Sequence, residues 1–269
     1  MRLHQKVIVI TGASGLLGKE HAKAVLAHGG SVALLDIRHG ELLNFKESLS
    51  SEHRDRTRIF ECDITNEPQV IEISKRILRE LGAVTGLVNN AAINAAVEGG
   101  MKNFTRFEDF SINSWNKEIS VGLTGAMICS KVFGNMMIEH KVAGSIVHIA
   151  SDHGIIAPNQ NLYRVEGLSE ELQPVKPVSY SVVKHGLIGL SRYIATYWSK
   201  QSIRSNALCP GGVRNGQDET FLFEFSKLVP MGRPADPDEY QGALIFLLSN
   251  DSSYMTGATL VIDGGRSAW

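Results

Sequence analysis

Tyr180 and Lys184 are four residues apart, so a helix would place both side chains on one face. An ammonium group beside a phenol favours the phenolate and lowers a pKa that is near ~10 for an isolated tyrosine. Such a phenol can take a proton from a carbinol oxygen or return it. The alternative is an ordinary aromatic residue on a helix surface with a solvated lysine beside it, so the pair needs support from other residues.

A glycine-rich turn follows the first apolar run of the chain. It reads Thr11-Gly12-Ala13-Ser14-Gly15-Leu16-Leu17-Gly18, and a helical pattern begins inside it. Glycines allow a tight turn and let backbone N–H groups approach a pyrophosphate at the helix N-terminus, where the helix dipole favours anions. A plain glycine-rich turn is the alternative, but the position directly after a strand favours a dinucleotide site.

Asp36 ends the next apolar run, about 20 residues further on. A carboxylate at this place can accept hydrogen bonds from both ribose hydroxyls of NAD and would repel the extra phosphate of NADP. Arg38 could weaken that preference, although a solvent-facing arginine is the simpler interpretation. The sequence therefore predicts NAD as the cofactor.

Composition excludes several classes of protein. The 269 residues are 43% hydrophobic and 20% charged, which excludes disordered and fibrous chains. Lys and Arg (27) nearly balance Asp and Glu (28), so neither nucleic acid nor an anionic membrane is expected as a partner. Three distant cysteines exclude a disulfide framework, and no histidine spacing indicates a metal site. With no apolar stretch near ~18 residues and no export signal, we expect a cytoplasmic protein.

Short β-branched runs alternate with longer amphipathic segments, which predicts an α/β fold with a doubly wound parallel sheet of the Rossmann type. We expect one domain over residues 1–269, because no repeat or linker divides the chain. The expected strands are Lys6–Ile10, Ser31–Leu35, Arg58–Glu61, Leu87–Val88, Ser145–Ile149, Ile203–Ala207 and Thr259–Ile262. The expected helices are Leu16–His28, Gly40–Leu49, Pro68–Leu81, Trp115–His140, Ser179–Lys200 and Pro237–Leu248.

Two long stretches, 94–113 and 158–178, interrupt this alternation. Long loops in compact α/β domains are uncommon and are often lids or binding loops, although a surface excursion without a role is the alternative. We expect the second to form an active-site lid within a substrate loop at about 152–178. Its polar residues suit a hydroxyl-rich or anionic substrate better than a steroid or an acyl chain.

Taken together, the motifs resemble the short-chain dehydrogenase/reductase family over essentially the whole chain. The motifs are the glycine turn, Cys62-Asp63, Asn89-Asn90-Ala91-Ala92, Ser151, Tyr180-x-x-x-Lys184, Pro210-Gly211-Gly212 and Thr256-Gly257-Ala258…Asp263-Gly264-Gly265. The resemblance implies that Ser151 holds the substrate oxygen, Tyr180 transfers the proton, and Lys184 lowers the pKa of Tyr180 and binds the nicotinamide ribose. It also implies a homotetramer (or homodimer) packed through the segment Gly242–Leu248.

The resemblance further implies a set of cofactor contacts on the glycine turn and the strand ends. They are Gly12, Ser14, Gly15, Leu16, Leu17, Gly18, Asp36, Ile37, Asp63, Ile64, Asn89, Ala91, Ala92, Tyr180, Lys184, Pro210, Gly211, Val213 and Asn215.

Three positions depart from the family pattern. The middle glycine of the turn, Gly15, comes one residue early, Gly122 replaces a catalytic asparagine, and Asn215 replaces a cofactor-binding threonine. Gly122, the long loop and the stretch 210–218 together resemble a narrower group, the flagellin-modification and nonulosonic-acid pathway dehydrogenases.

The predicted function is an NAD(H)-dependent oxidoreductase that interconverts a secondary alcohol and a ketone. The expected small-molecule substrate is hydroxylated or sugar-like, such as a nonulosonate or a sugar phosphate or nucleotide. An NADPH-dependent 3-oxoacyl or small-ketone reductase is one alternative, which Asp36 and the lack of a basic residue at Ser14 argue against. A non-catalytic NAD-binding regulator is another; Gly122 is its only support.

Overall fold

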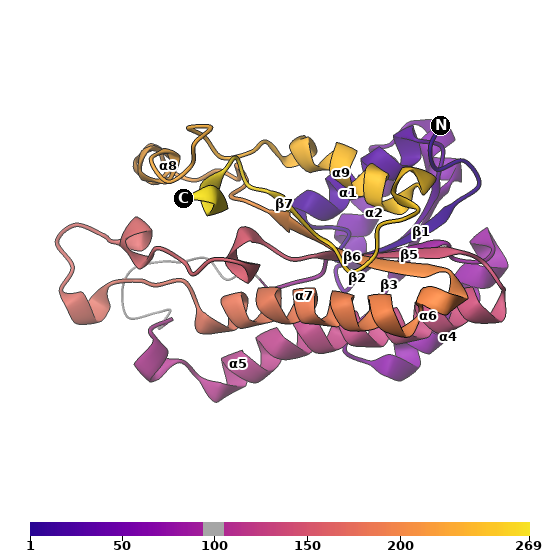
Figure 1. Ribbon diagram of the computed structural model, residues 1–269, viewed down its shortest axis with the longest axis horizontal. Coiled ribbons are helices and arrows are strands. Elements are labelled where there is room, and N and C mark those ends of the chain that lie inside the picture. The colour runs from indigo at the N-terminus through magenta and orange to yellow at the C-terminus, as the bar shows by residue number, and fades with distance from the viewer. Residues whose placement is uncertain (94–104) are drawn as a thin grey trace.

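Seven parallel strands form a single sheet in the order β3-β2-β1-β4-β5-β6-β7 (Figure 1). The computed structural model describes residues 1–93 and 105–269. The strands are β1 (Val7–Thr11), β2 (Ser31–Asp36), β3 (Thr57–Glu61), β4 (Gly86–Asn89), β5 (Gly144–Ile149), β6 (Ile203–Pro210) and β7 (Thr259–Ile262). The order reverses between β1 and β4, so the predicted doubly wound parallel sheet is confirmed.

Helices cover both faces of the sheet (Figure 1). One face carries α1 (Leu16–Ala27), α2 (His39–Glu47) and α9 (Gln241–Leu248). The other carries α4 (Glu67–Leu81), α5 (Ile112–Ile119), α6 (Gly125–Glu139) and α7 (Val178–Tyr197). Two short helices, α3 (Ser51–Asp55) and α8 (Glu219–Ser226), lie in connections where the sequence predicted no helix.

The strand β1 shows why the strands are apolar throughout. Successive side chains of a strand point to opposite faces of its sheet. Ile8 and Ile10 accordingly pack in the hydrophobic cluster under α1 and α9. Val7 and Val9 pack in the cluster under α4, α6 and α7. Because both faces are covered, an alternating polar pattern would place polar side chains in a core.

The long predicted helix 115–140 is interrupted by one π-helical turn, η2 (Ser120–Thr124), between α5 and α6. Gly122 lies in this turn, and a Cβ added there would be 2.6 Å from Cγ1 of Val183 on α7. The glycine therefore allows two helices to approach closely. By length and composition the stretch Ile112–Glu139 could cross a membrane, but 56% of its most apolar window is buried within the fold.

The predicted lid segment 158–178 is held together by its own polar contacts. It contains two short 3-10 helices, η4 (Gln160–Tyr163) and η5 (Glu170–Leu172). The amide of Gln173 accepts from the N–H of Val165 at 2.8 Å and donates to two main-chain carbonyls. Arg164 donates to both carboxylate oxygens of Glu170, at 3.1 and 2.7 Å. Of the other predicted loop, 94–113, the residues 94–104 lie outside the described residues.

Candidate active site

A cleft of about 1060 Å³ lies at the carboxyl ends of the strands, where the sheet order reverses between β1 and β4. In open α/β sheets this crevice is the usual place for a ligand. At one end the cleft is lined by the glycine turn and the end of β2, and at the other by Ser151, Tyr180 and the lid. Its volume is slightly above the ~300–1,000 Å³ usual for small-molecule sites, which suits a dinucleotide together with a substrate.

The glycine turn is shaped for close approach of a phosphate. Gly12 has a φ of +61°, and a Cβ there would lie 2.7 Å from the Cα of Ala91. A Cβ on Gly18 would overlap the carbonyl oxygen of Gly12. Within the described residues no side chain caps α1, so its first N–H groups remain available to an anion. A pyrophosphate fits this turn despite the early position of Gly15.

The carboxylate of Asp36 is nearly buried at the end of β2 and accepts hydrogen bonds from Ser14 and Arg38. Its Oδ2 accepts from the N–H of Ser14 at 3.0 Å and from the hydroxyl of Ser14 at 2.6 Å. Its Oδ1 accepts from the N–H of Arg38 at 3.1 Å. Both Asp36 and Arg38 line the cleft, and the Arg38 side chain is 57% exposed. The carboxylate is therefore oriented before any ribose binds.

Most predicted cofactor residues line the cleft. They are Gly12, Gly15, Leu16, Leu17, Asp36, Ile37, Asp63, Ile64, Ala91, Ala92, Tyr180, Lys184, Pro210, Gly211, Val213 and Asn215. The lining formed by the described residues does not include Ser14, Gly18 or Asn89. Ser14 lies behind Asp36 and supports it, and Gly18 packs against the glycine turn.

Asn89 lies in a buried polar group beneath the cleft. Its Nδ2 donates to the hydroxyl of Ser130 at 2.9 Å and is 3.3 Å from Nδ1 of His148. The neighbouring Asn90 holds the glycine turn instead, because its Nδ2 donates to the carbonyls of Thr11 and Gly12, both at 3.0 Å. In this geometry Asn89 supports the cleft floor, and Asn90, which the sequence reasoning missed, lines it.

Ser151, Tyr180 and Lys184 come together at the far end of the cleft. Lys184 is buried, and its Nζ donates to the carbonyl of Ile149 at 2.8 Å and lies 5.5 Å from the centre of the Tyr180 ring. Burial lowers the pKa of Lys184 to about 8. A lysine, a phenol and a hydroxyl therefore lie together at this end of the cleft.

Burial raises the pKa of Tyr180 to about 12, whereas the sequence predicted that Lys184 lowers it. The desolvation of the phenolate outweighs the other effects. The hydrogen bond between Tyr180 and Ser151 lowers the pKa, and the charge of Asp152 raises it. Phenolate formation therefore needs a further positive charge close to this end of the cleft.

The comparisons with known proteins agree with this geometry. Residues 6–164 match the family described as short chain dehydrogenase, and residues 168–267 match the family described as enoyl-(acyl carrier protein) reductase. The chain belongs to the short-chain dehydrogenase/reductase family. The predicted enzyme class, an oxidoreductase that acts on CH–OH groups, is thereby confirmed.

Relatives of this short-chain dehydrogenase/reductase match it over nearly their whole length. It is 30% identical to the NADH-dependent L-xylulose reductase of Ambrosiozyma monospora, over 100% of this chain and 97% of the relative. It is 28% identical to the D-threitol dehydrogenase of Mycolicibacterium smegmatis, over 98% of this chain and 94% of the relative. Among solved structures, a short chain dehydrogenase of Leptospira borgpetersenii with bound NAD+ has a TM-score of 0.85 at 27% identity, covering 99% of this chain and 94% of that one.

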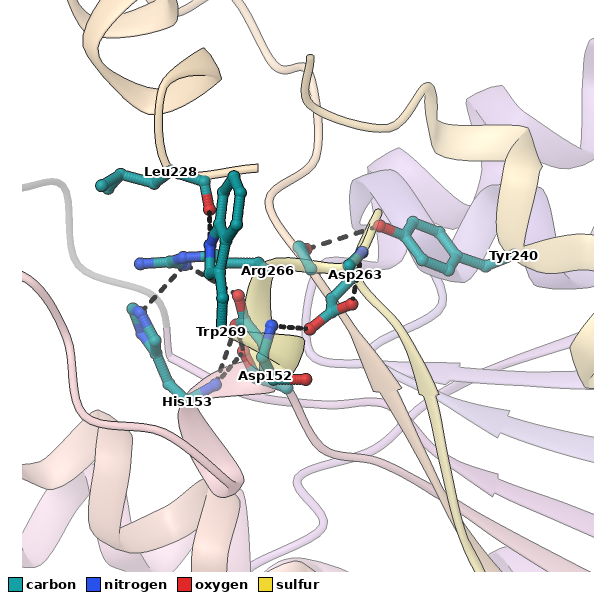
Figure 2. Close-up of polar contacts among 11 residues, drawn as sticks. Asp152, His153, Leu228, Tyr240, Asp263, Arg266 and Trp269 are labelled. Atoms are coloured by element: carbon teal, nitrogen blue, oxygen red, sulfur yellow. Dashed lines mark hydrogen bonds and ion pairs between the residues drawn. The ribbon is translucent and has the colours of Figure 1, made fainter. Parts of the chain in front are cut away.

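The substrate end of this dehydrogenase also contains charged residues that the sequence reasoning did not place there: Asp152, His153, Lys176 and Arg266. Arg266 lies beside both Asp152 and His153 (Figure 2). Its Nη1 is 2.7 Å from Oδ2 of Asp152 and 3.3 Å from Nε2 of His153. Burial lowers the pKa of His153 to about 4, and the positive charge of Arg266 acts in the same direction. The only sequence signal for Arg266 was its place directly after the Asp263-Gly264-Gly265 motif.

The run Ser151-Asp152-His153 contains the residue types of a hydrolase triad, but the contacts do not form a relay. The Ser151 hydroxyl donates to Oδ1 of Asp152 at 2.7 Å, and His153 contacts Ser151 through its main-chain N–H. A triad needs the histidine ring to accept the serine proton. Within the described residues there is also no group of His, Cys, Asp and Glu side chains that could hold a metal ion.

Proposed function

We propose that this protein is an NAD-dependent dehydrogenase that interconverts the secondary alcohol and ketone forms of a polyol or sugar-like substrate. The observation that carries the proposal is one continuous cleft that joins Asp36 to Ser151, Tyr180 and Lys184. Relatives named as an NADH-dependent L-xylulose reductase and a D-threitol dehydrogenase support this substrate class. The solved relative with bound NAD+ supports the cofactor.

The residues of the chain orient the substrate and the cofactor and transfer the proton. When bound, NAD supplies the hydride acceptor, and its oxidised ring supplies a positive charge. Tyr180, as the phenolate, takes the hydroxyl proton of the alcohol, while Ser151 donates a hydrogen bond to the same oxygen. Lys184 stabilises the phenolate and holds the nicotinamide ribose. In the reverse direction the phenol of Tyr180 returns the proton to the ketone oxygen.

The substrate end suits a polar ligand. Lys176 lines it, with its Nζ 4.1 Å from the centre of the Tyr180 ring, and the lid contributes Tyr163. Burial lowers the pKa of Lys176 to about 8, so the ammonium form is present at neutral pH. This cation favours an acidic sugar, such as a nonulosonate, as a more specific candidate within the same class.

The test is NADH formation, followed by absorbance, with NAD and matched sets of neutral polyols and acidic sugars. We expect Tyr180→Phe to lose more than about 100-fold in kcat on the best substrate, because it removes the proton acceptor. Tyr254→Phe is the control, because the side chain of Tyr254 is fully exposed and Tyr254 is not among the described residues that line the cleft. Near wild-type turnover by Tyr180→Phe would contradict the assigned roles. Tight NAD binding without turnover on either set would favour the regulator.

We also infer a homotetramer in the cytoplasm, as the family resemblance implies. On α7, Tyr193 and Tyr197 stack with their ring centres 5.6 Å apart, and their side chains are 63% and 62% exposed. Exposed aromatic pairs of this kind are common at protein interfaces. Light scattering coupled to size-exclusion chromatography measures the assembly directly; a monomer at micromolar concentration would contradict the inference.

A further inference from the structure

The carboxylate of Asp152 is bound from three sides at the catalytic serine. Its Oδ1 accepts from the Ser151 hydroxyl at 2.7 Å and from the N–H of His153 at 2.8 Å, and its Oδ2 accepts from Arg266 at 2.7 Å. The side chains of Arg266 and Asp152 are only 6% and 3% exposed. A salt bridge with so little solvent is held in one geometry, so the carboxylate is a fixed acceptor for the serine.

Arg266 reaches this place from the other end of the chain. It begins the 3-10 helix η9 (Arg266–Ala268), after the turn Asp263-Gly264-Gly265 that follows β7. The carboxylate of Asp263 fixes the turn, because it accepts from the N–H of Gly265 at 2.9 Å and from that of Ser267 at 2.8 Å (Figure 2). The sheet therefore brings to the active site a guanidinium group that lies 114 residues from its partner.

The contacts of Asp152 let Ser151 be oriented and then released. The serine must direct its O–H to the substrate oxygen during the reaction, and it then stops donating to Asp152. The carboxylate still keeps the N–H of His153 and the guanidinium of Arg266 as donors. The buried carboxylate thus has no unsatisfied oxygen when the serine turns away, which keeps the cost of the rotation small.

A carboxylate at this place also creates an electrostatic problem. Its negative charge raises the pKa of Tyr180 and so disfavours the phenolate that alcohol oxidation requires. A guanidinium at 2.7 Å from the carboxylate opposes that field at the phenol. Removing one partner of a buried ion pair leaves an uncompensated charge, and here that charge would act directly on the acid/base group.

We propose that Arg266 is a positioning residue for proton transfer: by pairing with Asp152 it holds the carboxylate that orients the hydroxyl of Ser151, and it opposes the field of that carboxylate at Tyr180. The inference rests on the proposed function for the role of Tyr180. The simpler interpretation is that Arg266 only ties the C-terminal turn to the fold, since its Cζ also lies 5.3 Å from the ring centre of Phe225. The two interpretations predict different effects of removing either charge of the ion pair. Only the positioning role predicts that the loss of Asp152 and the loss of Arg266 shift the ionisation of Tyr180 in opposite directions.

The experiment compares Asp152→Asn, Arg266→Met and the double variant, with kcat and kcat/KM for alcohol oxidation measured against pH. Asp152→Asn leaves the guanidinium unopposed, so the midpoint at which activity rises with pH falls by about one unit. Arg266→Met leaves the carboxylate unopposed, so the midpoint rises by about one unit. The double variant has neither charge, and its midpoint returns toward that of the wild type. Both single variants lose kcat by about tenfold or more, with KM for NAD unchanged.

Arg204→Met is the matched control. Arg204 is a partly buried arginine on β6 outside the cleft lining, and it donates to the carbonyls of Leu247 and Ser249 at 2.8 and 3.0 Å. Its loss should lower the melting temperature without moving the midpoint of the pH profile. If Arg266→Met does not fold, Asp152→Asn and the double variant, which contain no unpaired carboxylate, still provide the comparison.

A second readout does not depend on the substrate. The absorbance change of tyrosinate formation with NAD present, minus that of Tyr180→Phe, reports the ionisation of Tyr180 alone. Opposite shifts in the two single variants, with the double variant between them, would support the proposal. Shifts in one direction, or no shift, would overturn it. If no polyol or sugar is turned over, the substrate assignment fails, and the absorbance midpoints still test the ion pair.

Discussion

Replacement of Asp36 by serine should reverse the choice between NAD and NADP. The carboxylate is fixed by Ser14 and by the N–H of Arg38, so the hydrogen bonds it would make to a ribose are charge-assisted. Losing such a bond costs about 1.5–3 kcal/mol, or ~10–100-fold in kcat/KM for NAD. A 2′-phosphate carries a charge of about −1.5 to −2, and at ~5 Å and an effective dielectric constant of ~20 each unit meets ~3 kcal/mol of repulsion. Removing that repulsion should improve kcat/KM for NADP by ~100-fold or more.

The assay is initial-rate kinetics with both cofactors on one substrate, for Asp36→Ser, Asp36→Asn and Asp36→Ser with Arg38→Ala. Asp36→Asn keeps an acceptor for Ser14 and loses only the charge, so it should gain on NADP with a smaller loss on NAD. In the variant that combines Asp36→Ser with Arg38→Ala, part of the NADP gain should be lost, because the exposed guanidinium of Arg38, whose Nε lies 3.5 Å from Oδ1 of Asp36, can pair with a phosphate bound there. An unchanged ratio of the two kcat/KM values in Asp36→Ser would refute the assignment of this carboxylate to the adenosine ribose.

Three further changes test buried positions. Burial lowers the pKa of Lys184 to about 8, so the free energy of unfolding rises with pH between about 8 and about 10.5. Lys184→Met should therefore be inactive, yet its free energy of unfolding near pH ~7, measured with urea, should be higher by about 1–3 kcal/mol. Burial lowers the pKa of His21 to about 4, so the free energy of unfolding falls as the pH falls from about 6.5 to about 4. In His21→Leu this decrease should be smaller by ~1.4 kcal/mol per pH unit, as measured by unfolding at several pH values. Gly122→Asn should destabilise by about 1–3 kcal/mol, because its Cβ would meet Val183, and Val183→Ala should restore most of the melting temperature.

The sequence was sufficient to predict the sheet, because strands covered on both faces are apolar throughout and end at glycine or polar residues. The β7 strand was predicted with both its ends, Thr259 and Ile262. The helix Trp115–His140 was predicted as one element, but its π-turn was not, because that turn depends on the close approach of α7 at Gly122. The helix α8 was missed because it is only eight residues long, and its one buried side chain, Phe225, packs against residues far away in the sequence.

Within the site, most of the residues predicted to contact the cofactor line the cleft, but two polar residues of the motifs, Ser14 and Asn89, do not. Ser14 and Asn89 were expected to touch the cofactor because they lie in the motifs. The structure places Ser14 behind Asp36 and places Asn89 in a buried group with Ser130. Asn90, next to Asn89, lines the cleft instead, and which of these two adjacent asparagines does so depends on the direction of a side chain at the end of β4.

The role of Arg266 could not be predicted from the sequence alone. Its charge compensates Asp152, and that relation exists only because β7 pairs with β6 and the turn after it points toward the end of β5. Asp152 was visible in the sequence next to Ser151, yet a carboxylate beside a general acid/base group has no useful interpretation until its cation is known. A buried carboxylate next to Ser151 is stabilised when a cation lies within reach, and in this fold the turn after the last strand supplies that cation.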